Sequence, residues 1–329
     1  MSPFDENPPD PPRGPDGSAE TEPAAGEILE SRLAQSDLPL AGDLFSNAGA
    51  VPPAKWDCVP EDLRISWSWV HLVVFGVFFF VTQFLIATVV IGYYSVYQHL
   101  TQRQLRRLLE SDPKLLATTS VASFALIILF LYVTLSALRG MPFWRTLGWK
   151  KLNSDPLAGK GKPWMYFLSG CGLSLFVALA SSRVKNAEHA PIQEFFKSRN
   201  GAMMLMAMAV FVAPLAEETI FRGYLYPVFA RIISTIAGYF GMECSQAVRT
   251  GVASSILMTG ILFGLMHGPQ LGDNWELVSL LSLVGVIFTF ARAWTGTVLA
   301  SFLLHLGYNS MIAITAIIGT RGFTHMPPH

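Results

Sequence analysis

The side chains best suited to chemistry begin with Glu217, Glu218 and Arg222, which closely follow an apolar run at residues 201–213. Apolar residues resume directly after them, so these charges are expected inside a membrane helix, where each costs roughly 2.5–3.5 kcal/mol. On a helix, Glu218 and Arg222 are four residues apart and share a face, which predicts an ion pair. Glu217 points about a quarter turn away from Glu218. The spacing therefore predicts one paired carboxylate and one, Glu217, that is available to act as a base.

Two other apolar segments carry polar residues in positions four apart. Phe263 and His267 share a face at the end of one segment, and His305 and Asn309 share a face inside another. A structural role is an alternative for each pair, because a lone histidine is often a core or interface residue. Asn and His also form interhelical hydrogen bonds, worth about 0.6 kcal/mol on average. Arg292 is expected to snorkel from a helix end to the membrane surface.

Together these side chains supply the parts needed to hydrolyse an amide with water. A carboxylate provides a general base, one imidazole can assist it, and a second imidazole and an amide provide donors for an oxyanion. The sequence contains no GxSxG motif and no Cys–His pair within the apolar segments. Water is therefore the expected nucleophile, rather than a serine or cysteine side chain.

The elements that must hold these residues are membrane-spanning helices. A helix needs roughly 17–25 mostly apolar residues to cross a bilayer. About eight segments qualify, of which the fifth is short: residues 66–94, 116–138, 164–180, 201–226, 227–242, 252–268, 277–294 and 297–319. The basic stretch 102–109 is expected to form an amphipathic helix at the membrane surface. The predicted fold is all-α, a single bundle of membrane-spanning helices. The predicted location is therefore an integral membrane one, in the cell membrane if the host is bacterial.

The composition of the chain agrees with a membrane protein and separates an N-terminal tail from the membrane domain. Of 329 residues, 51% are hydrophobic and 14% are charged, whereas soluble domains carry roughly 25% charged residues. The acidic, proline-rich residues 1–63 are expected to be a disordered tail, residues 64–319 the membrane domain, and residues 320–329 a short C-terminal tail. The formal net charge is zero, so no nucleic-acid partner is expected. Cys58, Cys171 and Cys244 match no disulfide or metal pattern and are expected to be buried as small hydrophobes.

The three motifs, taken in order, resemble those of a known family. EETIFR, FGLMH and HLGYN, on successive apolar segments, are similar to the Glu-Glu-x-x-x-Arg, Phe-x-x-x-His and His-x-x-x-Asn motifs of the CAAX protease and bacteriocin-processing family of intramembrane endopeptidases. This family, also called the Abi family, includes the type II CAAX prenyl endopeptidases. The resemblance covers roughly residues 141–319 and implies an eight-helix bundle with an active site inside the membrane.

The resemblance also implies a role for each motif residue. Glu217 and His267 would activate a water molecule, while His305 and Asn309 would stabilise the oxyanion. Arg222 would hold the motif together through Glu218. The implied partners are a peptide or lipidated peptide as substrate, and membrane lipids.

Several alternatives remain open from the sequence. Glu217, His267 and His305 could instead bind zinc, since two histidines and one glutamate form a known catalytic zinc set. A mechanism without a metal is favoured, because no HExxH helix is present and three separate helices would have to supply the ligands. A non-proteolytic scaffold or immunity protein would not need Glu217. A transporter would more often show repeated halves, and no internal repeat is visible.

Overall fold

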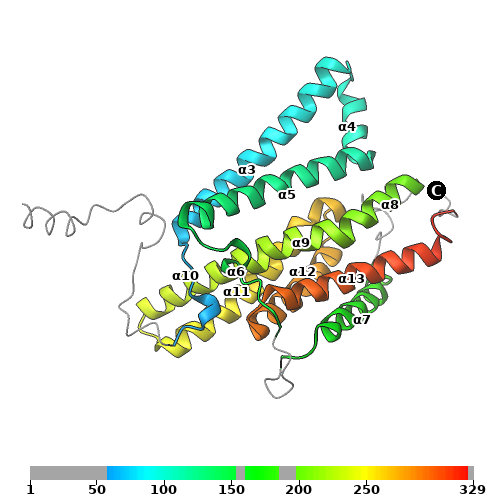
Figure 1. The fold of residues 1–329 in the computed structure, drawn as a ribbon. Coiled ribbons are helices and arrows are strands. Elements are labelled where there is room, and N and C mark those ends of the chain that lie inside the picture. Colours follow the sequence, from blue (N-terminus) through cyan, green and yellow to red (C-terminus); the bar gives the residue numbers. More distant parts are fainter. Residues whose placement is uncertain (1–57, 153–159, 185–197, 325–329) are drawn as a thin grey trace, which may run out of the picture. The chain divides into compact units, whose positions relative to one another are not determined.

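The computed structural model describes residues 58–152, 160–184 and 198–324, and these residues form helices and loops with no strand among them (Figure 1). Within these ranges, seven helical stretches are long and apolar enough to cross a membrane. The predicted all-α, multi-pass membrane fold is thus confirmed. The helices are α3 (Trp69–Gly92), α4 (Gln102–Ser111), α5 (Pro113–Leu135), α6 (Phe143–Thr146), α7 (Pro163–Ser181), α8 (Arg199–Ala207), α9 (Ala213–Glu218), α10 (Tyr226–Tyr239), α11 (Cys244–Met266), α12 (Trp275–Thr295) and α13 (Val298–Gly319).

Among the described residues, two of the predicted spans, 201–226 and 227–242, form a single stretch. Arg199–Tyr239 runs for 41 residues without a break. Two π-helical segments, η8 (Met208–Val212) and η9 (Thr219–Leu225), join α8, α9 and α10 into this stretch. The charged motif lies at the junction of α9 and η9, near the middle of the stretch.

Two prolines explain the π-helical segments. A proline inside a helix has no N–H to donate, and its ring clashes with the carbonyl group four residues earlier. For Pro214 that carbonyl belongs to Val210 in η8, and for Pro227 it belongs to Gly223 in η9. Each wider turn therefore accommodates a proline that would otherwise end or kink the helix. Such π-bulges are frequent at functional sites.

Glycines allow the closest helix contacts. A Cβ atom built on Gly307 of α13 would lie 2.0 Å from a backbone oxygen of α7, and one on Gly170 of α7 would lie 2.0 Å from a backbone oxygen of α13. Similarly, a Cβ on Gly285 of α12 would lie 2.7 Å from the carbonyl oxygen of Gly260 on α11. Larger side chains at these positions would push the helices apart. The glycines therefore keep α11 close to α12, and α7 close to α13.

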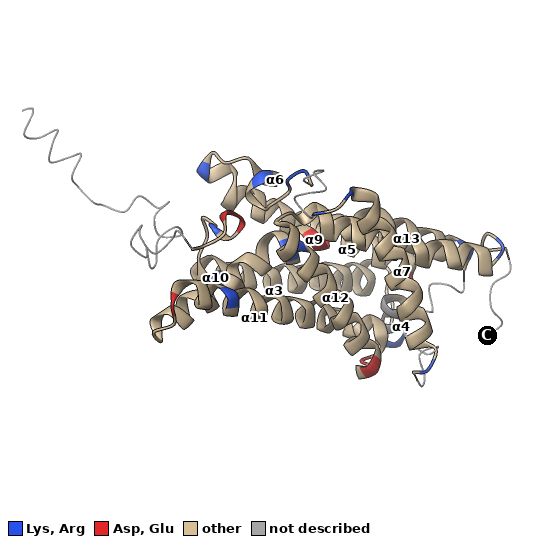
Figure 2. Cartoon of the chain, turned by 90° about the horizontal axis from the view of Figure 1, so that it is seen from below, with Lys and Arg blue, Asp and Glu red and all other residues tan. Residues whose placement is uncertain are grey.

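Charged residues are distributed mainly at the helix ends and in the connections (Figure 2). The exception is a charged group on α9, in the interior of the bundle.

The basic stretch 102–109 lies in α4, which confirms that it is helical. Thr101 caps this helix by accepting from the backbone N–H of Gln104.

Residues 58–68, here called the N-terminal strap, pack against the bundle before α3 begins. Leu63 is 3% exposed and packs with Tyr226, and Trp67 is 1% exposed and stacks on Tyr224 with ring centroids 5.7 Å apart. The predicted disordered tail therefore extended too far at its C-terminal end, because residues 58–63 are part of the packed structure. Residues 1–57 of that tail lie outside the described residues, as do residues 325–329 of the predicted C-terminal tail.

Arg292 was wrongly predicted to snorkel to the membrane surface. Its side chain is 1% exposed, and its Nη1 lies 2.8 Å from Oδ2 of Asp62 in the N-terminal strap. The guanidinium also lies 5.5 Å from the ring centroid of Tyr226. Sequence reasoning missed this pair because its two residues are 230 positions apart and Asp62 was assigned to the tail.

A buried polar chain links α3 and α5 to η9. The Thr134 hydroxyl donates to the carbonyl oxygen of Phe130, so its oxygen accepts from Nε2 of His71 at 2.9 Å. Nδ1 of the neutral His71 ring then accepts from the Tyr224 hydroxyl at 2.7 Å. His71 and Tyr224 are 1% and 0% exposed. This chain fastens the first two membrane helices to the segment that carries Arg222.

The expectation that all three cysteines are simple buried hydrophobes was wrong for two of them. Cys58 and Cys244 form a disulfide between the N-terminal strap and the start of α11, with Cα atoms 6.1 Å apart. Cys171 on α7 is a free thiol. Spacing could not reveal the pair, because 186 residues separate the two cysteines and only the folded bundle brings them together.

Breaking this disulfide is expected to make the N-terminal strap more mobile while the helix bundle stays folded. Cys58→Ser should lower the free energy of unfolding by about 2 kcal/mol, at the low end for disulfides, because membrane insertion already restricts the unfolded chain. We expect faster proteolytic cleavage within residues 58–68, measured on purified protein. Cys171→Ser is the matched control and should behave as wild type. Equal cleavage rates for Cys58→Ser and Cys171→Ser would contradict the prediction.

Candidate active site

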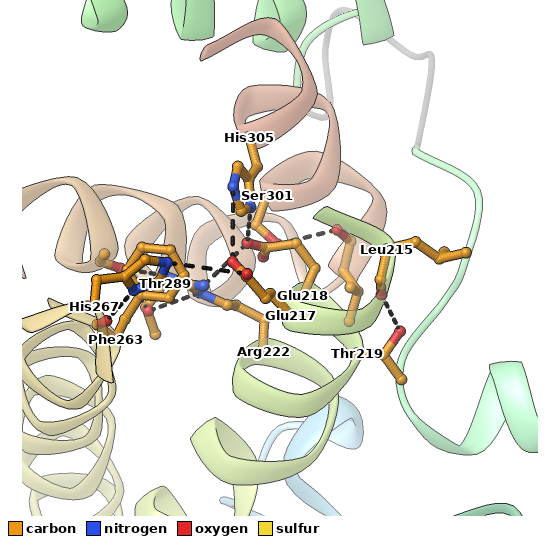
Figure 3. A network of polar contacts seen from close by, with 12 residues as sticks. Leu215, Glu217, Glu218, Thr219, Arg222, Phe263, His267, Thr289, Ser301 and His305 are labelled. Carbon is orange, nitrogen blue, oxygen red and sulfur yellow. Dashed lines mark hydrogen bonds and ion pairs between the residues drawn. The ribbon is translucent and has the colours of Figure 1, made fainter. Parts of the chain in front are cut away.

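Glu218 and Arg222 form a fully buried ion pair beneath the exposed part of the site (Figure 3). Arg222 Nη1 donates to Glu218 Oε1 at 3.0 Å, and both side chains are 0% exposed. This is the ion pair expected from their four-residue spacing. Because the Glu218 carboxylate is enclosed and neutralised, it cannot reach a substrate.

Aromatic rings surround the Arg222 guanidinium. It lies 4.6 Å from the ring centroid of Phe263 and 5.4 Å from that of Phe288. Phe263 also packs against His267, with ring centroids 4.7 Å apart. Phe263 thus covers the buried cation and contacts the His267 imidazole, a position consistent with the supporting role predicted for it. Such cation–π contacts stabilise a desolvated arginine.

Glu217 lies between the two histidines. Its Oε1 is 3.9 Å from Nε2 of His267, and its Oε2 is 3.9 Å from Nε2 of His305. Its side chain is 12% exposed and that of His267 is 20% exposed, in contrast to the enclosed Glu218. The fold therefore brings together three residues from α9, the end of α11 and α13, with Glu217 as the reachable carboxylate.

The hydrogen positions on the two imidazoles follow from their partners. Nδ1 of His267 lies 2.7 Å from the carbonyl oxygen of Phe263, which can only accept, so this nitrogen carries a hydrogen. Nδ1 of His305 lies 3.0 Å from Oε1 of Glu218, which is ionised opposite Arg222 and also accepts. In the neutral form of each ring, Nε2 therefore presents a lone pair toward Glu217.

Three hydrogen-bond acceptors consequently face one another in the site. The 3.9 Å separations are too long for direct hydrogen bonds. A water molecule can donate to two of these acceptors and still offer its oxygen lone pairs. The arrangement therefore suits a water molecule held beside Glu217.

Asn309 lies one turn beyond His305 on α13, and its amide makes a structural contact. Nδ2 donates to the carbonyl oxygen of Ala209, in η8, at 2.7 Å. This bond satisfies one backbone carbonyl of the π-helical segment and leaves a second amide hydrogen on Asn309. Sequence reasoning paired Asn309 with His305 by spacing and had no means to foresee the bond to η8.

Two histidines and a glutamate are also the donor set of a known class of catalytic zinc site. Within the described ranges, no group of three or more His, Cys, Asp and Glu side chains is arranged to hold a metal ion. Glu217, His267 and His305, the residues of the alternative zinc set, lie together in the fold, and zinc binding by them stays a prediction that metal analysis tests. Nδ1 of His305 lies 3.0 Å from Oε1 of Glu218, a contact that orients the ring toward Glu217 and that is equally compatible with a metal-free site and a metal-binding one.

The fold and the polar cluster define a multi-pass membrane protein with a buried acid–imidazole site. Residues 199–311 match the family described as type II CAAX prenyl endopeptidase Rce1-like. This region, which contains all three motifs, is thus of the CAAX protease type predicted from the sequence, and the match supports an intramembrane endopeptidase in general. No curated protein and no solved structure matches the chain.

Proposed function

We propose that this protein is an intramembrane endopeptidase in which Glu217 is the general base that activates water. The observation that carries the proposal is the position of the Glu217 carboxylate, 3.9 Å from Nε2 of both His267 and His305 and partly exposed. The neighbouring Glu218 is fully buried and paired, so it is unsuited to this role.

In the proposed reaction, water held by Glu217 and His267 attacks the carbonyl carbon of the scissile peptide bond. As the new C–O bond forms, one water proton passes to the Glu217 carboxylate, and the carbonyl electrons move to oxygen. Collapse of the tetrahedral intermediate breaks the C–N bond. Glu217 then returns the proton to the leaving nitrogen, which yields a carboxylic acid and an amine.

The developing oxyanion needs donors on the opposite side of the water. With Nδ1–H of His305 directed at Glu218, a doubly protonated ring would offer its Nε2–H to the oxyanion. The amide hydrogen of Asn309 that is not bonded to Ala209 is the second proposed donor. His267 has a neutral carbonyl as its Nδ1 partner, so its Nε2 lone pair suits the water instead.

The proposed substrate is a peptide, and a panel of fluorogenic peptides with and without a prenyl group tests this. Wild-type protein in detergent is expected to cleave at least one class, and Glu217→Ala and His267→Ala are expected to cleave none. Size-exclusion chromatography confirms that each variant remains folded. Cleavage by Glu217→Ala at the wild-type rate, or failure of wild type on every class, would contradict the proposal.

The proposed reaction draws on no metal, which chelation tests. Prolonged treatment with EDTA and 1,10-phenanthroline, followed by removal of the chelators, is expected to leave kcat unchanged. Metal content is measured in the same samples to show that stripping was complete. Activity that is lost on stripping and restored by zinc would instead favour the alternative metalloprotease mechanism.

A further inference from the structure

Helix α12 carries none of the three motifs, yet it holds the buried arginine of the site. Arg222 Nη2 donates to the carbonyl oxygen of Gly285 at 2.8 Å, and Arg222 Nε donates to Oγ1 of Thr289 at 3.2 Å (Figure 3). Arg222 and Thr289 are both 0% exposed. Because both side chains are enclosed, loss of either acceptor would leave an N–H group of the buried guanidinium without its partner.

The direction of the Thr289 contact is determined by its own hydrogen bond. The Thr289 hydroxyl donates to the carbonyl oxygen of Gly285 at 2.8 Å, so its single hydrogen is used within α12. The oxygen lone pairs are then left to accept from Arg222 Nε. Thr289 and Gly285, one helical turn apart, form a two-point acceptor site for one edge of the guanidinium.

This acceptor site fixes the orientation of the Arg222 guanidinium, and through it the positions of Glu218 and His305. A planar guanidinium held at Nε and Nη2 can present Nη1 in only one direction, and Nη1 meets Glu218. Glu218 in turn receives Nδ1 of His305, and Nε2 of that ring faces Glu217. A chain of contacts thus runs from α12 to the proposed general base.

We propose that Thr289 is a positioning residue of the active site, which sets the geometry of Glu217 and His305 through Arg222 and Glu218. This inference rests on the proposed function of Glu217. It assigns a part in the reaction to α12, which carries none of the three motifs. Thr289 lies behind the ion pair and does not touch the reacting atoms.

A positioning role and a purely structural role have different consequences. A residue that merely joins two helices changes stability and leaves kcat of the folded protein unchanged. A residue that positions the catalytic groups changes kcat, because misplaced catalytic groups stabilise the transition state less well. KM stays constant, because the contacts that bind the peptide are made by other residues. The conservative serine keeps the hydroxyl and should preserve the function.

The test compares Thr289→Val, Thr289→Ser and Thr259→Val in detergent, with kcat and KM for the best peptide and the melting temperature of each. Thr259 on α11 is the matched control, because it is also 0% exposed and its hydroxyl has no hydrogen-bond partner among the described residues. We expect Thr289→Val to lower kcat about 10-fold with KM unchanged, since it removes one hydrogen bond to a charged group. Thr289→Ser and Thr259→Val should keep the wild-type kcat.

Several results would overturn the inference: a wild-type kcat in Thr289→Val, an equal loss in Thr289→Ser, or a change confined to KM or melting temperature. If Thr289→Val does not fold, Thr289→Cys is compared with Thr289→Ser, since a thiol is a much weaker acceptor than a hydroxyl. Equal kcat values for these two would then overturn it. Glu217→Gln in the same assay separates the hypotheses, because retained cleavage there contradicts the proposed function itself.

Discussion

Replacing Glu217 by glutamine is expected to lower kcat by about 10³-fold while the protein stays folded. General base catalysis contributes typically 10²–10⁴-fold, and an amide of the same shape cannot accept the water proton. Glu217 lies outside the buried ion pair and is partly exposed, so its neutral replacement leaves no buried charge unpaired. The measurement is kcat with the preferred peptide, together with the melting temperature.

The neighbouring carboxylate provides the comparison. Glu218→Gln should lower the melting temperature as well as activity, because Arg222 loses its buried anionic partner and His305 loses the acceptor for Nδ1. Glu217→Gln should affect activity alone. If Glu217→Gln retains more than about a tenth of the wild-type kcat, the general base is a different group.

Replacing Arg222 by methionine is expected to destabilise the protein by about 3–5 kcal/mol. Removing one partner of a buried ion pair leaves the other charge desolvated and unpaired, here on Glu218, which is 0% exposed. The acceptors on α12 would also lose their donor. Thermal unfolding in detergent, followed by the yield of monodisperse protein, measures the effect.

A double variant distinguishes the lost charge balance from lost packing. Arg222→Met combined with Glu218→Gln removes both charges and should recover a large part of the stability without restoring cleavage. Lys150→Met is the control, since Lys150 pairs with Glu61 at 3.0 Å in an exposed position, where an ion pair contributes little to stability. A double variant no more stable than Arg222→Met alone would mean that packing against Phe263, rather than the charge, dominates.

The N-terminal strap and the His71 chain show how distant segments stabilise the helix that carries the site. Trp67 stacks on Tyr224, whose hydroxyl donates to His71, and Tyr224 lies two residues after Arg222 in η9. These contacts fasten η9 to the N-terminal strap and to α3. The sequence signal for these hydrogen bonds was His71, a histidine inside the long apolar segment 66–94. Its partners, Thr134 and Tyr224, lie on other helical segments, so residue spacing could not reveal them.

The sequence by itself determined the features that depend on local geometry. Length and hydropathy predicted the membrane helices, because crossing a bilayer sets a minimum apolar run. The four-residue spacing of Glu218 and Arg222 predicted their ion pair, since such residues share a face of any helix. The same reasoning distinguished Glu217 as the unpaired carboxylate, and order along the chain indicated the family that residues 199–311 match.

Only the tertiary structure decided which groups meet across helices. The joining of two predicted spans depends on π turns that accommodate Pro214 and Pro227. The Cys58–Cys244 disulfide links residues far apart in the sequence, and the threonine on α12 has no distinguishing motif. Such partners are chosen by the packing of whole helices, which depends on close glycine contacts and complementary buried polar groups rather than on the spacing of residues within one segment.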